Sequence, residues 1–201
     1  MRRAPLLLLA VLLLSACGSS AAAPPTTPTF QAPKISPYKG LTIPTKTAPL
    51  FTLHDDAGHA VSLASQRGRY TLVTFLYTHC PDICPLIAAN LNKALQELPT
   101  TKVSVLAVSV DPKGDTPTTV RAYVKAKQLV PRFHYLIGTK AQLAPIWKAY
   151  DVAAVATNKS VVNHVAYTVL IDPRGKERLI YDAQVHAADV VHDLRALTHA
   201  S

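Results

Sequence analysis

The stretch TLVTFLYTHCPDICP, residues 71–85, is the part of the chain that decides the fold. It opens with a nearly continuous run of β-branched and aromatic residues, which is typical of a strand buried on both faces. Two cysteines follow this run, and Pro85 suits the first position of a helix that we expect to reach Leu98. We therefore predict a buried strand, a cysteine loop and a helix in direct succession.

Periodic patterns on both sides of this unit predict an α/β domain. An alternating hairpin pattern precedes the unit, and strand and helix patterns follow it in turn before a second hairpin and a closing helix. This order predicts a thioredoxin-like fold, with a central mixed β-sheet flanked by helices and an N-terminal β-hairpin. Besides the hairpin strands at 51–53 and 61–63, we expect strands at 103–110, 133–137, 165–171 and 177–181, and helices that begin at Pro117, Lys140 and Ala187.

Residues 1–16 have the pattern of a lipoprotein signal peptide. Two arginines precede an apolar run of nine residues from Leu6 to Leu14, whereas a helix needs about 20 residues to cross a bilayer. The resemblance to bacterial lipoprotein signals implies cleavage before Cys17 and lipidation of its sulfur. The alternative is an ordinary secretory signal in which Cys17 has no role, and both interpretations place the protein outside the cytoplasm.

Residues 17–49 are expected to form a lipidated cysteine followed by a tether rich in proline, alanine and threonine. Residues 18–49 contain seven of the 16 prolines and show no apolar period that a core could use. We expect this segment to join the membrane anchor to a thioredoxin-like domain at residues 50–201. A plain spacer without further purpose is the alternative.

The net charge of +9 and the residue composition exclude some functions. The basic residues are scattered along the sequence, without the clustered stripe and interleaved aromatic residues that nucleic-acid binding requires. A solvated basic surface is expected, and it would also favour an anionic membrane or an acidic patch on a partner. Met1 is the only methionine, so a soft-metal site must use Cys80, Cys84 and histidine.

The two cysteines of the loop suit redox chemistry or a soft metal. Pro81 and Pro85 disfavour helical geometry at the residues before them, so we expect both cysteines on a loop. We expect Cys84, beside the start of the helix, to be the better stabilised thiolate, and Cys80 to gain less. The spacing lets both sulfurs face one small ion, and Cu(I) fits best because structural zinc prefers four ligands.

Several longer motifs add a resemblance to a known family. They are PLFTL, FLYTHCPDICP, AVSVDPKGDTP, FHYLIGTKAQLAPIWKAYDV and NHVAYTVLIDPRG, and the match runs from about Tyr38 to the end of the chain. With these motifs the chain resembles the Sco/SenC proteins, which help to assemble the copper-A centre of cytochrome c oxidase. The resemblance implies one copper ion bound by Cys80, Cys84 and His164. The family usually has aspartate before this histidine, and Asn163 here removes a carboxylate beside the site.

Other polar residues near the motifs have simpler interpretations. His79 adjoins Cys80, and we expect a solvent-facing side chain more than a contact with a metal ligand. Asp82 is expected to shape the loop by hydrogen bonds to its amides, with contact to a docking partner as the alternative. We expect Asp111 to belong to a turn, and either Asp115 or Thr116 to be the N-cap of the helix that begins at Pro117.

The resemblance implies a copper chaperone, lipid-anchored through Cys17 on the extracytoplasmic face of the bacterial cell membrane. It would carry Cu(I), with Cu(II) as a second candidate, to the copper-A site of cytochrome c oxidase subunit II. A thiol reductant or another copper chaperone would be a further partner. The main alternative is a thiol-disulfide reductase that uses Cys80 and Cys84 as a redox-active pair. A thiol peroxidase is disfavoured because Thr78 lies only two residues before Cys80.

Overall fold

The structure, a computed structural model, describes residues 36–98, 102–152, 155–156, 162–163 and 166–199. Contacts between residues define one compact unit from Ile35 to Ser201. The expected signal peptide, Cys17 and the first part of the expected tether lie outside the described residues, and so does His164.

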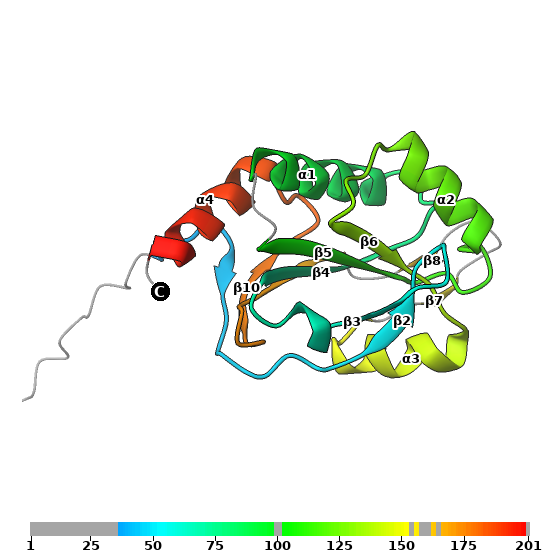
Figure 1. Ribbon diagram of the computed structural model, residues 1–201, viewed down its shortest axis with the longest axis horizontal. Coiled ribbons are helices and arrows are strands. Elements are labelled where there is room, and N and C mark those ends of the chain that lie inside the picture. Colours follow the sequence, from blue (N-terminus) through cyan, green and yellow to red (C-terminus); the bar gives the residue numbers. More distant parts are fainter. Residues whose placement is uncertain (1–35, 99–101, 153–154, 157–161, 164–165, 200–201) are drawn as a thin grey trace, which may run out of the picture. The chain divides into compact units, whose positions relative to one another are not determined.

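A six-stranded mixed sheet forms the centre of the unit, in the order β1-β10-β9-β4-β5-β6 (Figure 1). The two central strands β4 and β5 are parallel and paired over seven residues each, and every residue in them is buried. Full burial explains why their sequences are continuous apolar runs. The strands are β1 (Leu41–Thr42), β4 (Tyr70–Leu76), β5 (Val103–Ser109), β6 (Phe133–Leu136), β9 (Thr168–Ile171) and β10 (Glu177–Tyr181).

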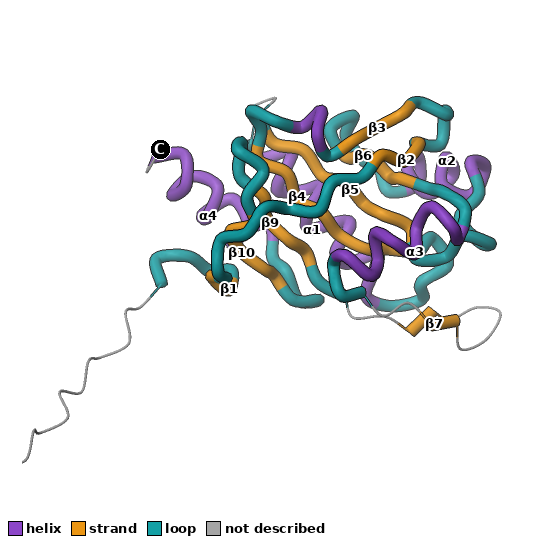
Figure 2. Tube along the Cα trace, turned by 90° about the horizontal axis from the view of Figure 1, so that it is seen from below, coloured by secondary structure: helices purple, strands orange, loops and turns teal. Residues whose placement is uncertain are grey.

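Helices cover both faces of this sheet. Helices α1, α2 and α4 lie on one face and α3 lies on the other (Figures 1 and 2). Thr116 and Thr139 each begin a helix with a capping box, in which the threonine side chain accepts a hydrogen bond from the backbone three residues later. The helices are α1 (Ile83–Glu97), α2 (Pro117–Ala126), α3 (Lys140–Ala149) and α4 (Ala187–His199).

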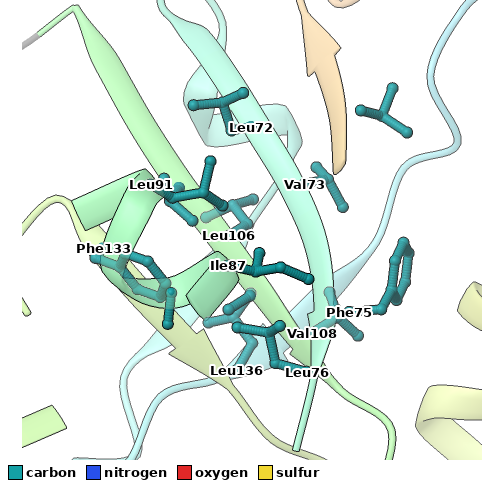
Figure 3. Close-up of a cluster of buried hydrophobic side chains, with 14 of the residues drawn as sticks. Leu72, Val73, Phe75, Leu76, Ile87, Leu91, Leu106, Val108, Phe133 and Leu136 are labelled. Carbon is teal, nitrogen blue, oxygen red and sulfur yellow. The ribbon is translucent and has the colours of Figure 1, made fainter. Parts of the chain in front are cut away.

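The core lies between the sheet and α1, with a second layer under α3. Ile87 and Leu91 of α1 belong to this buried cluster, and Phe75 points away from Leu72 and Leu76 to the opposite side of β4, because side chains alternate along a strand (Figure 3). On that side Phe75 contacts the ring of Tyr150, with ring centroids 5.5 Å apart. Trp147 of α3 is buried and donates a hydrogen bond from Nε1 to the Ser109 carbonyl at 3.0 Å. Trp147 therefore belongs to the core.

Two small hairpins flank the sheet. Strands β2 (Thr52–His54) and β3 (Ala60–Ser62) pair antiparallel, which confirms the N-terminal hairpin. Strands β7 (Val155–Ala156) and β8 (Val162–Asn163) form the second hairpin, which the sequence patterns did not predict. In Figures 1 and 2 this second hairpin lies at the end of the molecule away from α4.

The ordered domain extends further towards the N-terminus than the expected start at residue 50. Strand β1 pairs antiparallel with β10 at the edge of the sheet, although its residues were assigned to the tether. The backbone N–H groups of Lys39 and Gly40 both donate to the buried Asp193 carboxylate, at 2.8 Å each. Two-residue strands carry no periodic signal, so this edge depends on a long-range contact that local patterns do not reveal.

Candidate metal centre

The two cysteines lie together where β4 ends and α1 begins. Both are free thiols, Cys80 is 9% exposed and Cys84 is fully buried. The Cys80 amide donates to the Tyr77 carbonyl at 3.3 Å, which turns the chain directly after the strand. The backbone N–H of Cys84 then donates to the Cys80 sulfur at 3.4 Å. The loop therefore brings the Cys80 sulfur next to the N-terminus of the helix.

The prediction that both cysteines lie on a loop is wrong for Cys84. Helix α1 begins at Ile83, so Cys84 occupies its first turn and Pro85 is the third helical residue. Proline is tolerated in the first turn because the amides there have no partner within the helix. A residue before proline normally avoids helical backbone geometry. Cys84 adopts it nevertheless, and its side chain is buried against the core.

The stabilised thiolate is Cys80, and the expectation that it would be Cys84 is wrong. A hydrogen bond from the Cys84 side chain is the main cause that lowers the pKa of Cys80 to about 5. Burial opposes this shift, and hydrogen bonds from the Asp82 and Cys84 backbones and the Tyr77 side chain add to it. The amides at the helix start point to a sulfur that precedes the helix, so they favour Cys80.

Cys84 is held as a neutral thiol in the metal-free protein. Its hydrogen bond to Cys80 and its burial both raise the pKa of Cys84. At neutral pH the pair therefore consists of one thiolate and one thiol that share a proton between them. A soft cation that displaces this proton gains two adjacent sulfur ligands, which is the donor set that Cu(I) prefers.

A buried carboxylate holds the start of the cysteine loop. Asp115 is 4% exposed, and its Oδ1 accepts hydrogen bonds from the backbone and hydroxyl of Thr78, at 2.9 and 2.7 Å. Its Oδ2 accepts from Ser109 at 2.6 Å and from Tyr135 at 3.1 Å. Burial raises the pKa of Asp115, although these hydrogen bonds oppose the shift. The carboxylate thus ties the loop to the ends of β5 and β6.

Sequence reasoning missed this role of Asp115. Thr116 is the N-cap of α2 and forms its capping box with Thr119, so the helix does not use the Asp115 side chain. The expectation of a turn is confirmed for Asp111, whose Oδ1 accepts from the amides of Lys113 and Gly114. Thr116 and Thr119 are sufficient to cap the helix. Their spacing in the sequence is the signal that could have shown that Asp115 is not needed as the cap.

Tyr123 is a second residue that the sequence did not indicate. Its ring packs edge-on against Tyr135, with centroids 5.6 Å apart, and its buried hydroxyl has no hydrogen-bond partner among the residues that the structure describes. Burial raises the pKa of Tyr123, and electrostatic interactions with the cysteine pair and with Asp115 raise it further. The buried Tyr123 hydroxyl therefore lies close enough to the cysteine pair to interact with it electrostatically.

The remaining predicted residues differ in how the structure places them. His79 is exposed, and its Nδ1 lies 3.1 Å from the Thr78 hydroxyl. Asp82 is the N-cap residue of α1, and its side chain makes no capping hydrogen bond to the helix amides. Asn163 ends β8 opposite Val155, and the next residue, His164, lies outside the described residues.

No third candidate ligand joins the cysteines in the described part of the chain. Within residues 36–98, 102–152, 155–156, 162–163 and 166–199, no group of three histidine, cysteine or acidic side chains could hold a metal. The same residues contain no helix long and apolar enough to span a membrane.

Comparison with known proteins identifies the family. The SCO1/SenC family pattern matches residues 40–199. The chain belongs to the SCO1/SenC family. An SCO2-like protein of Rickettsia typhi is 26% identical over 158 residues, which cover 75% of this chain and 77% of that protein. This result confirms the resemblance inferred from the motifs.

Solved structures of Sco proteins share the fold. Arabidopsis thaliana ScoI with copper bound has a TM-score of 0.69 and 26% identity, and covers 78% of this chain and 100% of that chain. Bradyrhizobium japonicum ScoI with copper bound has a TM-score of 0.66 and 30% identity, and covers 75% of this chain and 99% of that chain. The predicted thioredoxin-like fold is confirmed.

Proposed function

We propose that this SCO1/SenC protein is a copper-binding assembly factor of cytochrome c oxidase and that it delivers copper to the copper-A site of subunit II. Cys80, Cys84 and His164 are the proposed ligands. The observation that carries the proposal is the pair of adjacent free thiols, with the Cys84 amide 3.4 Å from the Cys80 sulfur. Two related structures contain copper, which agrees with the sulfur donor set of this chain.

The cysteine pair is suited to a cargo that must be released again. Cys80 offers a thiolate at neutral pH, since its pKa is about 5, and Cys84 must lose its proton to become the second sulfur ligand. Incoming thiolates of an acceptor could exchange with these ligands one at a time, so that copper is never free in solution. A Cys80–Cys84 disulfide would remove both donors.

His164 is proposed as the third ligand for two reasons. The family resemblance implies it, and Asn163, the residue before it, ends strand β8. The cysteine loop follows the C-terminal end of strand β4. The C-terminal part of α4 marks the other end of this strand, because it lines a cavity together with Tyr70, the first residue of β4. The β7–β8 hairpin lies away from α4, so it lies on the side of the cysteine loop. Asn163 stands where the family usually has aspartate, so the residue before the proposed ligand carries no carboxylate.

A Cu(I) titration of the reduced protein against a competing chelator tests the proposal. We expect one tightly bound copper, and Cys80→Ser, Cys84→Ser and His164→Ala should each weaken it strongly. His186→Ala is the matched control, because His186 is exposed and lies at the start of α4. Equal binding by His164→Ala and His186→Ala would remove His164 from the ligand set. Absence of binding by the unaltered protein would overturn the copper proposal.

The second candidate function is thiol-disulfide reduction of the acceptor cysteines. The lowered pKa of Cys80 supports it, since the thiolate is the form of cysteine that attacks a disulfide. His164→Ala separates the two functions, because reduction needs only the two cysteines whereas copper transfer needs the whole ligand set. Full reductase activity in His164→Ala, with copper transfer lost, would show that both functions use one pair.

The proposed location is the extracytoplasmic face of the cell membrane, with a lipid anchor on Cys17. The signal pattern of residues 1–16 and the proline-rich segment after it support this location. Metabolic labelling with a fatty acid tests the anchor, and Cys17→Ser should abolish the label. Label retained by Cys17→Ser would contradict lipidation at this residue.

A further inference from the structure

The fold gathers five basic residues at the end of the sheet opposite the cysteine pair. We call this surface the basic end and define it as Arg67, Arg69, Lys102, Arg174 and Arg178. They come from three separate segments of the chain. The Gly68 amide donates to the Pro173 carbonyl at 2.9 Å, and the Tyr70 amide donates to the Lys102 carbonyl at 2.9 Å. These two contacts bring the three segments together.

The side chains at the basic end are mostly exposed. Arg67, Arg69, Lys102 and Arg174 are exposed, and the Arg67 side chain donates to the Arg174 carbonyl. Arg174 and Arg178 line a cavity of about 480 Å³, together with Tyr38, Tyr70 and Asp172. Asp172 is the one acidic residue of this lining, and its Oδ2 pairs with Arg178 at 3.3 Å. The basic end therefore carries a strong excess of positive charge.

We propose that the basic end binds the anionic headgroups of a lipid bilayer. Cationic side chains at a membrane surface act together with a lipid anchor, because one signal alone holds a protein only weakly. Tyr38, two residues after the first described residue, lines the same cavity, and Cys17 lies 21 residues before it in the sequence. The segment that leads from the expected anchor thus enters the domain beside the basic end.

A bilayer fits this surface better than an acidic protein does. A stable protein interface has an apolar centre, whereas the residues that define the basic end are all cationic. Headgroups need only an accessible field of positive charge.

Binding through the basic end would orient the cysteine pair. Strand β4 begins at the basic end and its seven residues span roughly 23 Å, at about 3.3 Å per residue. With the basic end on the bilayer, the cysteine loop faces away from it, where a domain of a membrane-bound acceptor is accessible. This orientation does not depend on whether the cargo is copper or an electron pair.

Vesicle co-sedimentation of residues 18–201 tests the proposal, since this chain keeps the whole compact unit from Ile35 and lacks the lipid. We expect binding to vesicles that contain phosphatidylglycerol, none to pure phosphatidylcholine, and release in about 1 M salt, where the Debye length is about 3 Å. Arg69→Gln with Arg174→Gln should weaken binding about 25-fold, at about fivefold for each cation.

The matched control is Lys113→Gln with Lys140→Gln, which removes the same charge from exposed sites near the cysteine end. We expect this control to bind almost as well as the unaltered chain. Equal weakening by both pairs of substitutions would overturn the proposal, because binding would then follow net charge alone. Failure of the unaltered chain to bind anionic vesicles would also overturn it and would leave an acidic protein as the partner.

Trp147 reports the orientation, because it is the only tryptophan and its indole bonds to Ser109 at the far end of β5. A quencher placed in the lipid headgroups should leave its fluorescence unchanged in the bound protein. Strong quenching would contradict binding through the basic end. Vesicle binding needs no copper, so these results are independent of the copper titration.

Discussion

The two ends of strand β4 place charge in different environments. At the cysteine end Asp115 is 4% exposed and accepts four hydrogen bonds, so its position is determined by buried donors. At the basic end Arg69 and Arg174 are exposed. Buried charge must be matched by specific partners, whereas exposed charge acts collectively and is screened by salt. The first end is therefore suited to a defined binding geometry and the second to a diffuse surface.

Asp115→Ala should have the largest effect and would break the cysteine end. Ser109 and Tyr135 are buried and would lose their common acceptor, so we expect a loss of about 3 kcal/mol in the free energy of unfolding. Asp115→Asn keeps one carbonyl acceptor and should cost about 1 kcal/mol. Urea denaturation measures both changes.

The matched control is Asp111→Ala in the same loop. The Asp111 side chain accepts from the amides of Lys113 and Gly114 in a partly exposed turn, so this change should cost about 1 kcal/mol or less. Equal losses for Asp111→Ala and Asp115→Ala would show that burial of Asp115 adds nothing to stability.

The pH dependence of Cys80 alkylation sharpens the comparison next. Thiolate reactivity should rise with a midpoint near pH 5, in place of the ordinary value of 9.0 for a cysteine thiol, because hydrogen bonds at the helix start lower the pKa of Cys80. The folded-state pKa lies below the unfolded value, so the stabilisation is fully present above pH 9 and is lost as the pH falls through 5.

Cys84→Ala tests the cause of this shift. It removes the donor that lowers the pKa of Cys80 most, so the alkylation midpoint should rise by at least about one unit, which corresponds to about 1.4 kcal/mol. Cys84→Ser keeps a hydroxyl donor and should shift the midpoint less. An unchanged midpoint in Cys84→Ala would assign the effect to the backbone amides alone.

Arg178→Gln should have a smaller effect on stability, although Arg178 belongs to the basic end. Its guanidinium pairs with the buried Asp172 at 3.3 Å, so its loss leaves that carboxylate with backbone donors only. We expect a loss of about 1 kcal/mol in the free energy of unfolding, measured by urea denaturation. No loss of stability would mean that the backbone amides satisfy Asp172 without the arginine.

Arg69→Gln with Arg174→Gln should have the smallest effect on stability. Exposed substitutions away from caps and cores usually change the free energy of unfolding by less than about 0.5 kcal/mol. The same pair is expected to weaken vesicle binding strongly, so stability and binding separate at this end of the molecule. A destabilisation as large as that of Asp115→Ala would show that the basic end is structural.

The features of the fold and the site that could be predicted are those that lie within one continuous segment of the sequence. Residues 71–85 hold the central strand, both cysteines and the start of α1, and each of these was predicted from neighbouring residues. Strand β1 and the contact of Asp193 with Lys39 and Gly40 were not predicted, because the bonded groups are far apart in the sequence. Leu41 of β1 pairs with Ile180, and the two Asp193 contacts join residues that are 154 and 153 positions apart. The role of Asp115 was missed for a similar reason, since its donors come from three elements.

By itself the sequence determined the family, the fold class and the two thiols, because motifs and apolar periods are local properties of the chain. Only the tertiary structure decided that Cys80 is the thiolate, because that depends on the direction of the amides at the start of α1. It also decided that basic residues scattered along the sequence form one surface. The sheet places residues 67–69, 102 and 174–178 at one end, and charge density depends on distance in space and not on distance along the chain.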